Sequence, residues 1–218
     1  MRIGLVSLAI ILLSLSAIAS ANGNKLESVG AFSDQSASQS LRDSLEPGGQ
    51  RVILEDGSAH CDIWLRKALP AGAKTEVQGA IYTDFSESLL IGVISFSKPA
   101  TDFRGQGIKP GAYTLRYTLH PVDGNHLGIS PVRDFLVMIP VSVDQNPDAK
   151  YKFEELAKMS TKASETNHPA VISLVAAEGG SPSVKANDHH HIVFSAKIKA
   201  ASGSETPIAF VVKGIAEQ

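Results

Sequence analysis

The sequence contains a single cysteine, Cys61, so no disulfide can form within the chain of 218 residues. The fold must therefore depend on its hydrophobic core, and a hydrophobic content of 43% with 19% charged residues is typical of a globular protein that has one. In residues 61–65, Cys61, Ile63 and Leu65 fall on one face of an expected strand. We interpret Cys61 as a buried structural thiol; the alternative is a reactive or intermolecular thiol.

Clusters of basic residues are also absent, and the formal net charge is −2. Binding to nucleic acid requires grouped lysines and arginines that neutralise phosphates, so this composition argues against a nucleic-acid partner. The sequence has no N-x-S/T glycosylation site. That absence favours a bacterial exported protein over a eukaryotic one.

The common catalytic motifs are missing as well. The sequence has no G-x-S-x-G, no H-E-x-x-H, no phosphate-binding loop and no dinucleotide-binding glycine pattern. An enzyme therefore ranks below a binding protein and a metal-binding protein among the functions we expect.

The N-terminus has the pattern of a secretory signal peptide, residues 1–21. Arg2 precedes an apolar run at residues 3–15, and small residues at 17–21 offer cleavage after Ala19 or Ala21. The run is shorter than the roughly 20 residues that span a bilayer, so an uncleaved membrane anchor is the less favoured alternative. No cysteine follows it for a lipid anchor. We expect a bacterial protein exported to the periplasm or medium, with no membrane span after cleavage.

Two further regions follow the signal peptide. Residues 22–50 are rich in Ser, Gly and Gln and predict a flexible N-terminal segment, with a short helix at 38–45. Residues 51–218 predict an all-β domain with one surface α-helix at 151–162. Apolar runs and period-two patterns predict strands at 51–55, 60–66, 75–82, 89–96, 112–120, 135–141, 170–177, 190–200 and 207–213.

The strand at 112–120 has the clearest alternation, which predicts one face in the core and one in water, as in an antiparallel sheet. About nine strands with regular turns predict an antiparallel β-sandwich of immunoglobulin-like or jelly-roll-like type.

Four stretches of the sequence together resemble a known family. They are 54–57 (LEDG), 61–67 (CDIWLRK), 102–117 (DFRGQGIKPGAYTLRY) and 121–128 (PVDGNHLG). They are similar to an uncharacterised family of exported bacterial proteins, acidobacteria-like, over roughly residues 40–213. The resemblance implies bacterial export and carries no activity.

The long polar loop at 120–134 is the first candidate site. His120, Asp123 and His126 are residue types that bind zinc or copper. Arg133, or Arg104 from the 102–106 turn, would instead bind a carboxylate or hydroxyls of a small ligand or an envelope protein. The structural alternative is that the polar side chains only tie the loop to the sheet.

The second candidate is the run Asp188–His191. On the strand predicted there, His189 and His191 share a solvent-facing side and form a pair able to chelate a divalent ion. The alternative is a solvated strand start, because two ligands are fewer than the four of a structural zinc site. The favoured function is a non-catalytic exported binding module, and the alternative is a metal-binding exported protein.

Overall fold

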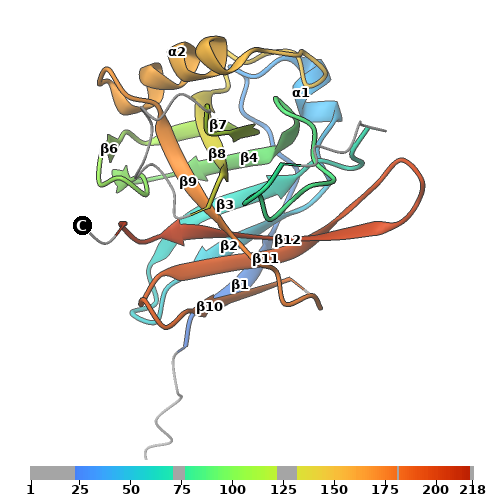
Figure 1. Ribbon diagram of the computed structural model, residues 1–218. Coiled ribbons are helices and arrows are strands. Elements are labelled where there is room, and N and C mark those ends of the chain that lie inside the picture. Colours follow the sequence, from blue (N-terminus) through green and yellow to red (C-terminus); the bar gives the residue numbers. More distant parts are fainter. Residues whose placement is uncertain (1–22, 71–76, 122–131, 181, 217–218) are drawn as a thin grey trace, which may run out of the picture.

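The computed structural model describes residues 23–70, 77–121, 132–180 and 182–216, and within them the fold is all-β with two helices (Figure 1). The helices are α1 (Gln39–Asp43) and α2 (Phe153–Ser164). The strands are β1 (Lys25–Val29), β2 (Gly49–Ile53), β3 (Ala59–Leu65), β4 (Leu90–Phe96), β5 (Ala100–Thr101), β6 (Gly107–Ile108), β7 (Gly111–Leu119), β8 (Asp134–Pro140), β9 (Ala170–Val175), β10 (Ser183–Ala186), β11 (Ile192–Lys199) and β12 (Glu205–Lys213).

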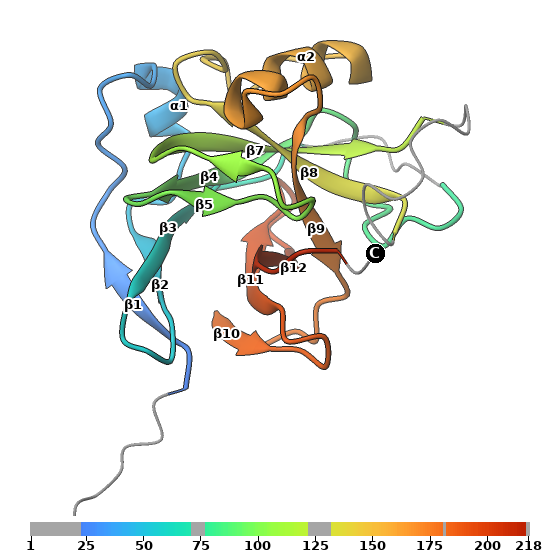
Figure 2. The ribbon, with the colours of Figure 1, turned by 90° about the vertical axis from the view of Figure 1, so that its left-hand side faces the viewer.

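Ten of the strands form one antiparallel sheet in the order β1-β2-β3-β4-β7-β8-β9-β12-β11-β10, while β5 and β6 pair separately. The sheet curves strongly, so that its two edge strands β1 and β10 come close to each other (Figures 1 and 2). No helix in the described part of the chain is long and apolar enough to cross a bilayer.

Strand β9 joins the two parts of this sheet. Ala170–Ser173 pair with β8, and Leu174 and Val175 pair with β12. The last four strands have the spatial order β9-β12-β11-β10, which is a Greek key. The hydroxyl of Tyr82 spans the point where β9 and β12 diverge, donating to the carbonyl of Val175 (2.6 Å) and accepting from the N–H of Ala209 (2.8 Å).

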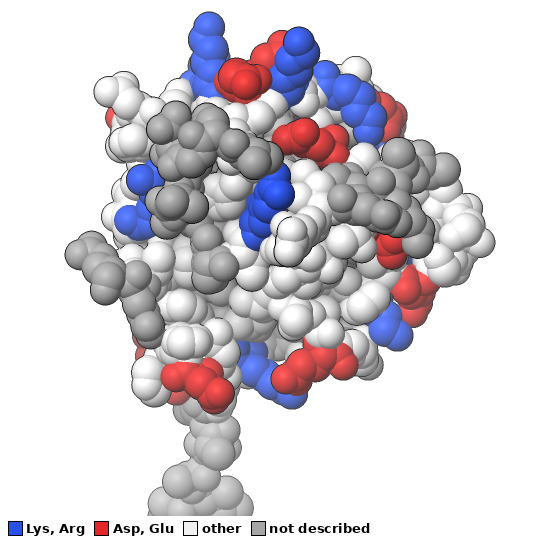
Figure 3. Space-filling view, in the orientation of Figure 1, with Lys and Arg blue, Asp and Glu red and all other residues white. Residues whose placement is uncertain are grey.

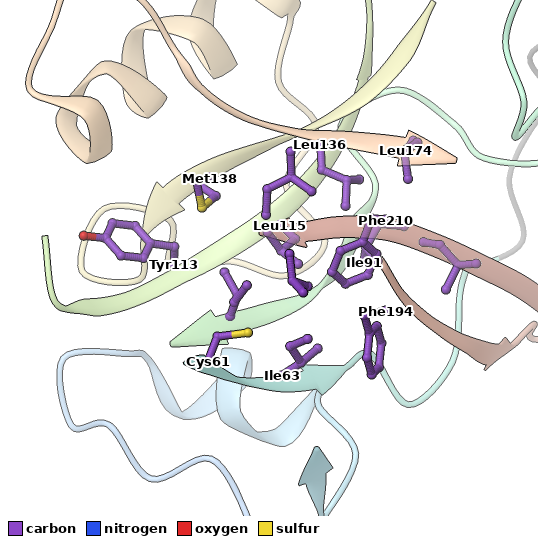
Figure 4. Packing of buried hydrophobic residues seen from close by; sticks show 14 of the residues in the cluster. Cys61, Ile63, Ile91, Tyr113, Leu115, Leu136, Met138, Leu174, Phe194 and Phe210 are labelled. Carbon is purple, nitrogen blue, oxygen red and sulfur yellow. The ribbon is translucent and has the colours of Figure 1, made fainter. Parts of the chain in front are cut away.

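The inner face of the curved sheet holds the main hydrophobic core. Its side chains come from both parts of the sheet, including Cys61 and Ile63 on β3 and Phe194 and Phe210 on β11 and β12 (Figure 4). Cys61 is buried, as the sequence predicted, and burial raises the pKa of its thiol, which keeps it protonated and unreactive.

The outer face of the sheet is covered over β3, β4, β7 and β8. The prediction that one side of the strand at 112–120 faces water is therefore wrong. Thr114, Arg116 and Thr118 are fully buried. Leu41 of α1 packs in a cluster with Trp64 and Val93. Leu156 of α2 packs in another against β8 (Figure 2). The strand has one polar face, as the alternation predicted. That face is buried under the helices, where Arg116 is paired with a carboxylate.

Arg116 and Asp144 form an ion pair in which both side chains have no exposed surface. Arg116 Nε donates to Asp144 Oδ2 (2.6 Å) and Nη2 to Oδ1 (2.8 Å), the two-pronged geometry that offsets the cost of burying charge. The guanidinium also donates to the carbonyl of Asn146 (2.7 Å) and lies over the Tyr151 ring. One arginine on β7 thereby holds the connection between β8 and α2.

The N-terminal segment carries defined structure, unlike the flexible segment that its composition predicted. β1 pairs with β2 over five residues, and α1 forms within the predicted 38–45 stretch. The indole N–H of Trp64 donates to the carbonyl of Gly30 (2.8 Å), and the Phe32 ring lies 5.1 Å from the Trp64 ring. A few apolar side chains and side-chain hydrogen bonds therefore order a polar stretch.

The strand predicted at 75–82 is absent from its described part, residues 77–82, which form turns and irregular chain. The buried carboxylate of Asp134 accepts from the backbone N–H groups of Ile81 (2.9 Å) and Tyr82 (2.8 Å). These groups are satisfied by a side chain, so no partner strand is needed.

Candidate functional site

The base of the 120–134 loop is fixed where it leaves the sheet. The N–H of His120 donates to the carbonyl of Arg133 (2.9 Å), and the N–H of Arg133 donates to Gly79 (3.2 Å). The His120 ring lies 4.7 Å from the Phe135 ring. Asp123 and His126 lie outside the described residues, so convergence of the three predicted ligands stays a prediction.

Arg104 sits on a rigid turn built around Asp102. The buried Asp102 carboxylate accepts from the N–H groups of Arg104 (3.0 Å), Gln106 (2.8 Å) and Val171 (3.0 Å). Gly105 adopts φ +80°, a conformation that favours glycine, beside the Ile215 side chain. Asp102 therefore fixes the direction of the backbone that carries Arg104.

The structure separates Arg104 from the base of the 120–134 loop along the sheet. The 102–106 turn meets β9 at Val171, which pairs with Val137 of β8. The loop ends at Asp134, the first residue of β8, three residues further and roughly 10 Å along the strand. The 102–106 turn instead adjoins the C-terminal segment, because the N–H of Ala216 donates to the carbonyl of Phe103 (2.8 Å).

The predicted histidine strand is a turn. β11 begins only at Ile192, and residues 187–191, which we call the histidine turn, connect it to β10. Asn187 Oδ1 accepts from the N–H groups of His189 (3.1 Å) and His191 (2.9 Å), and His190 adopts φ +58°. Asparagine favours such turns because its side chain bonds the backbone two residues on, which outweighed the apolar pattern of β11.

His191 is the central side chain of this turn. Its ring packs edge-on to Phe103 (5.3 Å between centroids) and lies 5.8 Å from the His189 ring. Its Nε2 is 3.0 Å from the carbonyl oxygen of Ile215. Gly214 leaves the necessary room, because a β-carbon there would stand 2.4 Å from His191 Cδ2. His191 thus connects the histidine turn, the 102–106 turn and the C-terminal segment.

A hollow of about 470 Å³ opens beside the histidine turn. Its lining comes from the β2–β3 turn, β5, the β10–β11 connection and the end of β12, and includes Asp56, Thr101, His190 and Lys213. These segments lie on the left of Figure 1, the side that faces the viewer in Figure 2. Sequence reasoning missed the hollow because its walls come from five segments, including Asn24 before β1, that only the sheet brings together.

The charges at the hollow are of both signs. Hydrogen bonds from Ser58, helped by Lys213 and Lys98, lower the pKa of Asp56. Burial lowers the pKa of the neighbouring His60, whose Nε2 is 2.8 Å from the carbonyl oxygen of Val212. Acidic and basic side chains are also interspersed on the face of the molecule that is turned to the viewer in Figure 3. The hollow therefore offers paired donors and acceptors rather than one dominant charge.

The described surface also has two smaller hollows. One of about 310 Å³ borders the histidine turn and is lined by residues that include Glu178, Lys185 and Asp188. Another, of about 280 Å³, lies beside Tyr82 and Pro207. Within the described residues, no group of three or more His, Cys, Asp or Glu side chains is placed to hold a metal ion.

Comparison of the chain with protein-family models, with curated proteins and with solved structures finds no match.

Proposed function

We propose that this protein is an exported, non-catalytic binding module whose ligand site is the 470 Å³ hollow beside the histidine turn. The observation that carries the proposal is the hollow itself. Its volume falls in the range of small-ligand sites, about 300–1,000 Å³. Its walls are turns held by a hydrogen-bonded sheet, the arrangement in which binding groups are usually presented.

The lining suggests the ligand's chemistry. Lys213 and Asp56 line the hollow with opposite charges. Thr101 and His190 add hydrogen-bonding groups to the same lining. Such a set suits a small polar ligand that carries both donors and acceptors, such as a zwitterion or a sugar. The same turns would suit contact with an envelope protein.

The experiment is a thermal-shift screen with free amino acids, dipeptides, monosaccharides and disaccharides as probes. A probe present at 100 times its Kd should stabilise the protein by about 2.7 kcal/mol. Lys213→Met and Asp56→Asn should remove the shift, and Lys158→Met on the exposed side of α2 should not. Equal shifts in all four proteins would place the ligand elsewhere, and no shift with any probe would count against a small-ligand site.

Export is part of the same proposal. The pattern of residues 1–21 supports cleavage after Ala19 or Ala21, and the resemblance to exported bacterial proteins agrees with it. Expression in a bacterium, with mass spectrometry of the periplasmic fraction, should find a chain that starts at Ser20 or Asn22. A full-length chain that remains in the cytoplasm would contradict export.

For the architecture we propose a β-sandwich whose two layers meet at β9. The change of partner along β9 and the Greek-key order support it. Amide hydrogen exchange of the two edge strands distinguishes a sandwich from a closed barrel. In a sandwich the outward backbone N–H groups of β1 and β10 exchange rapidly, whereas in a closed barrel they are protected.

The metal-binding alternative through His120, Asp123 and His126 is favoured by one observation: the bond between His120 and Arg133 draws the two ends of the loop together. In a His189→Asn background, titration with zinc or copper should then raise the melting temperature, and the additional change His126→Asn should abolish the rise. An unchanged melting temperature at large metal excess would exclude this alternative.

A further inference from the structure

The histidine turn holds two imidazole rings in a defined relation. The centroids of His189 and His191 are 5.8 Å apart and their planes differ by 27°. Asn187 fixes the backbone of both residues, and the N–H of Asn187 donates to the carbonyl of His191 (2.9 Å), which closes the turn. The backbone of both residues is therefore held by hydrogen bonds, and the His191 ring is held as well by its contact with the Ile215 carbonyl.

The ring of His191 is oriented as a metal-binding histidine usually is. Its Nε2 lies 3.0 Å from the Ile215 carbonyl oxygen, which only accepts hydrogen bonds, so Nε2 carries the proton of the neutral ring. Nδ1 is then the nitrogen with a lone pair. Metal-binding histidines typically donate their other ring N–H to a carbonyl or a carboxylate in this way, which fixes the tautomer.

The separation of the rings fits one shared ion. Imidazole nitrogen binds zinc or copper at about 2.0–2.1 Å, so one ion can lie between two rings whose centroids are 5.8 Å apart once the nearly parallel rings turn and a nitrogen of each faces it. His189 is exposed at the surface, where a metal ion from solution can reach it.

We propose that the histidine turn binds a divalent transition-metal ion through His189 and Nδ1 of His191, with water completing the coordination. Copper(II) should bind more tightly than zinc, following the general order of affinities. With two protein ligands the site is exchangeable rather than structural, because structural zinc sites take four. Metal binding at this turn requires neither an organic ligand in the hollow nor the 120–134 loop.

The test uses the whole mature chain and the metal alone. Zinc and copper(II) are titrated while amide and histidine signals are followed by NMR, with Kd obtained by calorimetry. Copper at a small fraction of an equivalent should broaden first the signals of His189, His191 and Ile215. His189→Asn should weaken binding at least about tenfold, whereas His190→Asn and His168→Asn should change it less than twofold.

Two further variants keep the test decisive. Gly214→Ala displaces the His191 ring without removing a histidine and should also weaken metal binding. Lys213→Met, which alters the hollow, should leave metal binding unchanged, so failure of this site and failure of the hollow are distinguishable. Unchanged affinity in His189→Asn, or equal losses in all the histidine variants, would overturn the proposal.

Discussion

The helix-covered and the uncovered parts of the sheet differ in how they treat their outer faces. Along β7 and β8 nearly every residue is buried, because α1 and α2 close the outer side. Along β11 buried positions alternate with exposed or half-buried ones. The covered part buries its main ion pair, while the uncovered part displays charged and histidine side chains. Stability and surface chemistry are therefore carried by different parts of one sheet.

The largest effect should come from breaking the covered ion pair. Arg116→Met leaves the Asp144 carboxylate buried without its cation and should cost about 3–5 kcal/mol of unfolding free energy. Arg51→Met removes the partly exposed partner of Asp62 and should cost about 1 kcal/mol or less. Urea unfolding followed by circular dichroism measures both. Similar losses in the two variants would mean that burial does not distinguish these pairs.

Removal of the helix contact should have the next largest effect. Leu156→Ala creates a cavity between α2 and β8 and should cost about 2–5 kcal/mol. The matched change on the uncovered part, Val193→Ala at a half-buried position, should cost about 1 kcal/mol. Thermal and urea unfolding give both values. A loss at Val193 as large as that at Leu156 would contradict the distinction.

A smaller effect is expected at the C-terminal segment. Gly214→Ala places a β-carbon against the His191 ring and should cost about 1–3 kcal/mol. Gly107→Ala, where the new β-carbon meets no atom within 4 Å, should stay within about 0.5 kcal/mol. Chemical shifts of the histidine turn should change only in the first variant. Unchanged shifts there would mean that the close approach is not kept in solution.

The smallest effect concerns pH. Burial lowers the pKa of His60 below its unfolded value of about 6.5. The unfolded chain therefore takes up this proton first, and stability should fall as pH decreases from about 6.5 towards the folded pKa. His60→Gln should reduce that slope, whereas His168→Gln at an exposed position should not. Urea unfolding between pH 7.5 and pH 5 measures it, and identical slopes in wild type and His60→Gln would refute the assignment.

The strands with strong apolar patterns could be predicted within about two residues. Those at 60–66, 89–96 and 135–141 correspond to β3, β4 and β8, and the helix at 151–162 to α2. Burial of Cys61 followed from the same patterns. In these segments local preference and burial agree, so the sequence alone is sufficient.

The other features of the fold and of the candidate site depend on contacts between residues that are distant in the sequence. β1 and β10 are short and largely polar, and pairing with β2 and β11 makes them strands. Arg116 looked solvent-facing because its partner Asp144 lies in a connection beyond the next strand. The hollow could not be predicted for the same reason. The histidines were predicted to lie on a strand because the apolar pattern of β11 does not reveal the turn that the Asn187 side chain holds.

The divided strand β9 has a consequence for the order of folding. Strands β1 to β8 pair mostly with near neighbours in sequence. Leu174 and Val175, in contrast, pair with β12, so their ladder can form only after β12 has been synthesised. Contacts between distant segments form slowly because a long loop must first be closed. We therefore expect the covered part to assemble early and the β10–β12 hairpins to dock last. Synthesis and assembly would then run in the same direction, with the histidine turn among the last features to form.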